Sequence, residues 1–129
     1  MHHSFSVLLL PRLRPAWRWL LAALVLVVAW FAFSPAVGTD AFEHLDKLKH
    51  VLAFGCLATV ASLGWTATTT ARCGIALSLL LYGAFIELVQ SAIPSRTASW
   101  LDLLADGAGI AGGLLAVQLA RWHLGRQDA

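Results

Sequence analysis

Apolar segments long enough to cross a membrane constrain this chain more than any other feature. No charged residue occurs between residues 19 and 33, and further apolar segments run over about 49–65, 73–93 and 101–120. A transmembrane helix needs about 20 mainly apolar residues to cross roughly 30 Å of hydrocarbon. With the first segment placed at 17–33, we predict an all-α membrane protein that forms a four-transmembrane-helix bundle.

Composition supports a single integral membrane domain over residues 1–129. The chain is 59% hydrophobic and 12% charged, and its mean hydropathy is +0.74. Soluble domains average about 25% charged residues. The net charge of +2, with no long basic run, argues against nucleic acid as a partner. We therefore expect the lipid bilayer as the main partner and leave a homo-oligomer open.

The first apolar segment has two interpretations. Trp17, Trp19 and Trp30 suit the aromatic belts of a retained span. However, the basic stretch at 12–18, the apolar run and the small residues at 36–38 also resemble a cleaved secretory signal peptide. We favour the retained span and keep cleavage as the alternative.

Basic residues predict the orientation. The connections at 66–72 and 94–100 are short, so neighbouring helices should be antiparallel. Six basic residues fall beside one membrane face, namely Arg12, Arg14, Arg18, Arg72, Arg121 and Arg126. The other face receives Lys47, Lys49 and Arg96. This imbalance predicts cytoplasmic termini. Six of the seven acids gather toward the extracytoplasmic side: Asp40, Glu43, Asp46, Glu87, Asp102 and Asp106.

Three pairs of polar residues share helical faces, because each pair is three or four residues apart. The pairs are Asp46 with His50, Glu87 with Gln90, and Asp102 with Asp106. Glu87 lies roughly 10 Å below the predicted helix end. A carboxyl group at that depth costs several kcal/mol unless it is paired, protonated or hydrated. Glu87 is therefore the strongest candidate for a functional site.

These residues suggest two roles. We predict proton transfer by Glu87, His50 and Asp46. We predict ligand binding by a second set: Lys47, Gln90, Arg96, Asp102 and Asp106. Arg96 is suited to holding a phosphate group in a bidentate manner.

Plainer roles remain open for several of these side chains. Asp102 follows Ser99 by three residues, so the two can form a helix cap. Gln90 can simply hydrogen-bond between helices, and Arg96 can anchor at the interface. Asp46, His50, Glu87 and Asp102 can also ligate a metal, but they come from three predicted helices without a compact motif. We therefore predict no metal and no cofactor.

Small residues form two stripes at four-residue spacing on the last segment. The stripes are Ala105, Gly109 and Gly113, and Ala108, Gly112 and Ala116. Such stripes let helix backbones approach closely. The first stripe continues from Asp102 and Asp106, so both aspartates should point into the bundle.

Several of these elements together resemble the VanZ-like family of small bacterial membrane proteins. The matching elements are Asp46-Lys47, His50, Phe54, Glu87-Leu-Val-Gln90, Arg96, Ala98-Ser99, Asp102-Leu-Leu-Ala, Gly109 and Gly113. The resemblance covers about 46–113. One position departs from it, since the family usually has asparagine where this chain has Asp106.

The resemblance implies a multi-pass protein of the bacterial inner membrane with a cell-envelope role. The family's namesake is linked with resistance to the glycopeptide antibiotic teicoplanin. Our leading hypothesis is a site that binds or modifies the headgroup of an envelope lipid or glycolipid at the extracytoplasmic face. The alternatives are a small proton-coupled transporter using Glu87, and a non-catalytic scaffold subunit. The resemblance alone does not establish an enzyme.

Overall fold

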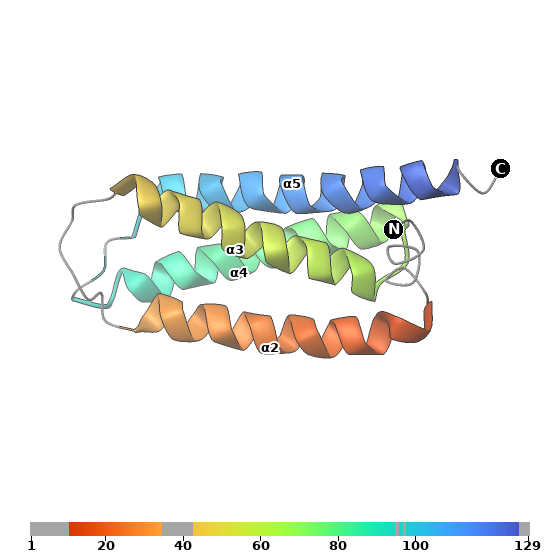
Figure 1. Cartoon of the computed structure of the whole chain (residues 1–129). Helices are drawn as coiled ribbons and strands as arrows, with labels where there is room; N and C mark the ends of the chain where they lie inside the picture. Colours follow the sequence, from red (N-terminus) through yellow and green to blue (C-terminus); the bar gives the residue numbers. More distant parts are fainter. Residues whose placement is uncertain (1–10, 35–42, 95, 97, 127–129) are drawn as a thin grey trace.

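The computed structural model describes residues 11–34, 43–94, 96 and 98–126, and this part of the chain is helical as predicted. A short 3-10 helix, η1 (Pro11–Leu13), leads into α2 (Arg14–Phe33). The remaining helices are α3 (Glu43–Gly64), α4 (Thr69–Gln90) and α5 (Trp100–Gly125). Successive helices run antiparallel, so α2 begins and α5 ends at the same end of the bundle (Figure 1).

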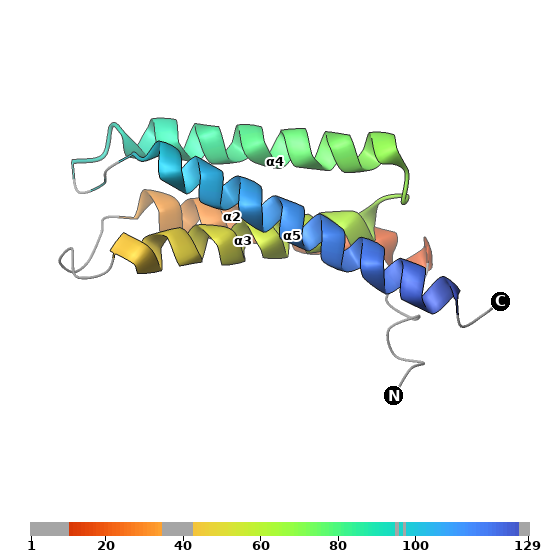
Figure 2. The same ribbon diagram turned by 90° about the horizontal axis from the view of Figure 1, so that it is seen from above.

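Helix α3 lies at the centre of the packing. It contacts the three other helices, most extensively α5, which crosses it obliquely (Figure 2). The buried core cluster comprises Phe54, Leu57, Ala58, Leu79, Ile86 and Ile110. Half of this cluster therefore belongs to α3.

Three helical segments are long and apolar enough to cross a membrane: Pro11–Phe33, Thr69–Gln90 and Trp100–Gly125. Many of their large apolar side chains face outward, including Trp30 and Leu26, which are 73% and 71% exposed. A lipid environment accommodates such surfaces. Helix α3 is not among the three, because its first two turns carry charged residues.

The helix boundaries differ in detail from the prediction. Helix α4 ends at Gln90 rather than at residue 93, and tight turn bonds follow from Ala92 N–H to Val89 O and from Ile93 N–H to Gln90 O. Pro94 prevents the helix from continuing, because proline disfavours helical backbone at the residue before it, Ile93. Asp40 lies outside the described residues.

A glycine notch brings α3 and α5 together. A Cβ atom at Gly109 would collide with Val51 O, and one at Gly113 would collide with Gly55 O. The predicted inward face is confirmed, since the buried residues of α5 include Asp102, Ala105, Asp106, Gly109 and Gly113.

The second small-residue stripe does not pack as predicted. Ala108, Gly112 and Ala116 are all exposed. A Cβ atom at Gly112 would meet no described atom within 4 Å. This stripe faces outward because α5 turns its other face, which carries the aspartates and Gly109 and Gly113, toward α3.

Candidate functional site

His50 is the centre of a buried polar cluster between α3, α4 and α5. Its Nδ1 lies 2.8 Å from Oδ1 of Asp106, whose side chain is fully buried. In the tautomer protonated at Nδ1, the ring donates to this carboxylate. The close approach of α5 at Gly109 brings Asp106 to this distance, one turn before the glycine notch.

Glu87 enters the cluster from α4. Its Oε2 accepts a 2.7 Å hydrogen bond from the backbone N–H of Ser99. Its Oε1 lies 4.0 Å from Nε2 of His50 and has no hydrogen-bond partner among the described residues. Glu87 therefore points into the bundle, and one oxygen remains available beside the imidazole.

Ser99 rather than Asp102 caps the first turn of α5. The Ser99 hydroxyl accepts a hydrogen bond from Leu101 N–H at 3.2 Å. In a capping box Asp102 would accept a hydrogen bond from the Ser99 N–H, but here Glu87 accepts it. The Asp102 side chain instead turns inward, and its Oδ1 lies 4.0 Å from Lys47 Nζ. The capping role considered for Asp102 thus falls to Glu87, a residue from another helix.

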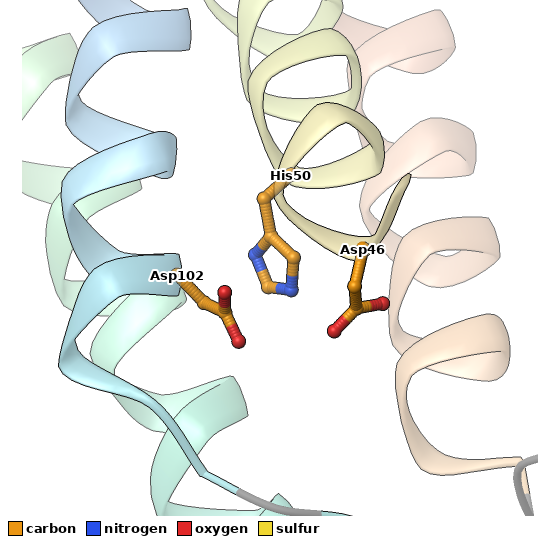
Figure 3. A group of neighbouring side chains, drawn as sticks. All are labelled: Asp46, His50 and Asp102. Carbon is orange, nitrogen blue, oxygen red and sulfur yellow. The ribbon is translucent and has the colours of Figure 1, made fainter. Parts of the chain in front are cut away.

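Asp46 lies beside the imidazole from the first turns of α3. Figure 3 shows Asp46 and Asp102 on either side of the His50 ring. One ligand atom from each of the three residues lies within 4.8 Å of the others. Asp46 also forms a loose ion pair with Lys49, with 4.0 Å between Oδ1 and Nζ.

Gln90 and Arg96 fasten the C-terminal end of α2. Gln90 Nε2 donates to Ala32 O at 3.0 Å. The Arg96 guanidinium donates to Phe31 O at 2.9 Å and to Ser34 O at 3.0 and 3.2 Å. The last carbonyls of a helix lack intrahelical partners. Both side chains therefore stabilise the C-terminal end of α2. For Arg96, these hydrogen bonds were not predicted from the sequence.

A cavity of about 340 Å³ lies beside the cluster. Its polar lining comprises Asp46, Lys49, His50, Gln90 and Arg96. Its apolar lining comprises Val28, Phe31, Ala32, Ala53, Phe54 and Ile86. Asp46 and His50 belong to both the cluster and the cavity.

Comparisons with protein-family models, curated proteins and solved structures found no match to this chain.

Seven of the eight predicted site residues thus lie in the cluster or line the cavity, and the eighth, Lys47, faces the cluster through Asp102. Lys49 was not among the predicted site residues and served only to predict the orientation. The three-residue spacing of Asp46 and Lys49 was the available signal, since such residues are neighbours on a helix.

Proposed function

We propose that all four helices cross the bacterial inner membrane, with both termini cytoplasmic and the polar cluster toward the extracytoplasmic face. The inward direction of His50 supports a fourth span, since this side chain pairs with Asp106 rather than facing lipid. The arginines at the opposite end support the orientation. Two of them bind the end of α3, with Arg18 donating to Gly64 O and Arg121 donating to Ser62 O.

We further propose that the chain is a VanZ-like envelope protein that binds the phosphate-bearing headgroup of a lipid or glycolipid. The cavity is the observation that supports this proposal. It has apolar walls from α2, α3 and α4 and polar side chains from the first turns of α3, the end of α4 and the connection to α5. Its volume of about 340 Å³ falls within the roughly 300–1,000 Å³ of small-molecule sites. An amphiphile matches this division between apolar and polar linings.

The cavity's charged residues suggest how a headgroup would be held. Lys49 and Arg96 supply positive charge. The Arg96 Nε and one terminal nitrogen already donate to α2, so Lys49 is the more available cation for a phosphate. If the ligand is modified, His50 is the cavity-lining group that can take up a proton. Glu87 Oε1 lies 4.0 Å from its Nε2, a distance that one bridging water would span for proton transfer.

A cavity-filling substitution tests the binding proposal. Ala53→Phe places a ring in the cavity, whereas Ala116→Phe adds the same ring on an exposed face of α5. Each variant would be released from nanodiscs of equal phosphatidylglycerol and phosphatidylethanolamine and analysed by native mass spectrometry. We expect retained phosphatidylglycerol to fall at least fivefold in Ala53→Phe and to stay unchanged in Ala116→Phe. Equal retention in both variants would refute the cavity as the binding site.

The link with glycopeptide resistance needs a separate measurement. The chain would be expressed in a teicoplanin-susceptible bacterium and compared with Glu87→Gln and Asp102→Asn at matched protein levels. We expect both variants to lose any protection and any change in lipid profile. If both behave as the parent chain, the polar cluster has no part in the function.

Proton-coupled transport is the second candidate, favoured by the buried Oε1 of Glu87 beside His50. Reconstituted vesicles distinguish the two functions. Substrate-dependent proton flux that disappears in Glu87→Gln supports transport, whereas lipid binding without flux supports a headgroup site.

A further inference from the structure

Three metal-ligating side chains converge at the cluster although the sequence places them on two distant segments. Asp46 and His50 lie one helical turn apart on α3, and Asp102 lies in the first turn of α5. Their ligand atoms lie within 4.8 Å of one another, and Figure 3 shows the imidazole between the two carboxylates. Donors held on packed helices are positioned more precisely than donors on loops.

Buried oxygens without hydrogen bonds are the second, independent observation. Asp102 is 3% exposed and Glu87 is 9% exposed. Asp102 Oδ1 and Glu87 Oε1 each lack a hydrogen-bond partner among the described residues. Burying a carboxylate oxygen without a partner is costly, and a cation removes that cost. Glu87 Oε1 is also 4.0 Å from His50 Nε2, within reach of the same centre.

Asp106 orients the imidazole for ligation. When Nδ1 carries the proton and donates to Asp106, Nε2 has a free lone pair. Metal-bound histidines almost always donate their other ring N–H to a carboxylate, a carbonyl or water, which fixes the tautomer. His50 with Asp106 has this arrangement.

Charge balance favours a divalent ion. The cluster holds four carboxylates, from Asp46, Glu87, Asp102 and Asp106, and two ammonium groups lie beside it, from Lys47 and Lys49. In the deprotonated state that metal ligation requires, with His50 neutral and both lysines charged, two negative charges remain for a cation to balance. Both lysine ammonium groups are 4.0 Å from their carboxylates, too far for a hydrogen bond. The lysines therefore leave the carboxylate oxygens free to ligate.

We propose that Asp46, His50 and Asp102 bind a first-row divalent cation such as Mn²⁺ or Zn²⁺, with Glu87 as an additional ligand. An imidazole nitrogen among carboxylates suits these ions better than Ca²⁺ or Mg²⁺, which prefer all-oxygen sites. Bonds of about 2.1 Å place donor atoms roughly 3–4 Å apart, so small side-chain rotations close the site. The inference is independent of the headgroup proposal, since ion binding is measured directly.

The test uses the full chain, purified without a histidine tag, stripped with chelator and kept in detergent. Calorimetric titration with MnCl₂ and, separately, ZnCl₂ should give one ion per chain, and elemental analysis after gel filtration should give the same stoichiometry. We expect at least tenfold weaker binding in Asp46→Asn and Asp102→Asn. Asp106→Ala removes the acceptor for the His50 Nδ1–H and should weaken binding roughly 10- to 100-fold through the orientation of His50.

His123→Gln is the matched control, because this histidine lies in the last turn of α5, far from His50 along the bundle. It should bind as the parent chain does. Asp46 is half-exposed, so its substitution tests ligation with little risk to folding, and helical circular dichroism without metal verifies the fold. Absent binding in the parent chain, or unchanged affinity in both Asp46→Asn and Asp102→Asn, would overturn the proposal.

Discussion

Glu87 accepts the backbone N–H of Ser99 at a distance of 2.7 Å, joining the end of α4 to the start of α5. A capping box normally places both partners on one helix. Here Ser99 supplies the cap hydroxyl, and the carboxylate comes from the preceding helix. The connection between the two helices is therefore held by a residue that also faces His50.

Removing the Glu87 acceptor should loosen the start of α5. Glu87→Leu leaves the Ser99 N–H unpaired, whereas the amide oxygen of Glu87→Gln can still accept it. We expect Glu87→Leu to cost about 1–3 kcal/mol of stability and Glu87→Gln to cost less. Hydrogen exchange at the Ser99 amide, alongside thermal unfolding in detergent, measures both effects. Equally fast exchange in the two variants would contradict the assigned hydrogen bond.

The glycine notch predicts opposite outcomes for two glycines of α5. Gly109→Ala would force α3 and α5 apart at Val51 and should destabilise the chain by about 1–3 kcal/mol. Gly112→Ala has open space and should be neutral or stabilising by up to about 1 kcal/mol, since alanine is the better helix former. Denaturant titration of both variants provides the comparison, and a destabilised Gly112→Ala would count against the packing described.

Arg96 should contribute to stability as well as to any ligand binding. Arg96→Ala removes its hydrogen bonds to Phe31 O and Ser34 O. We expect a loss of about 1–3 kcal/mol, because the helix-end carbonyls lose a charged donor. Arg126→Ala, at the exposed end of α5, should change stability by less than about 0.5 kcal/mol. If Arg96→Ala unfolds at the same temperature as the parent chain, these hydrogen bonds contribute nothing to stability.

The proposed four-span orientation predicts which connections react from outside the cell. In a chain with Cys56 and Cys73 replaced by alanine, Ala98→Cys should react with a membrane-impermeant maleimide on intact spheroplasts. Ala67→Cys, in the connection between α3 and α4, should react only after lysis. Reaction of both sites from outside would mean that α4 does not cross the membrane.

The predicted helices follow from local properties of the chain. Apolar runs of this length form helices in lipid because each backbone polar group must find a partner within its own segment. The three- and four-residue spacing of Asp102, Asp106, Gly109 and Gly113 likewise predicts their common face, which α5 buries. The second stripe failed as a prediction because spacing identifies a face but not the direction in which the folded helix turns it.

The sequence by itself determined which segments are helical and which polar residues share a face. The tertiary structure decided their partners: His50 with Asp106, 56 residues away, and Arg96 with Phe31, 65 residues away. It also decided that Glu87 rather than Asp102 holds the Ser99 N–H. These pairings depend on how the packed helices rotate and cross, and side-chain contacts across the whole bundle determine both. Helical periodicity, in contrast, depends only on neighbours along the chain.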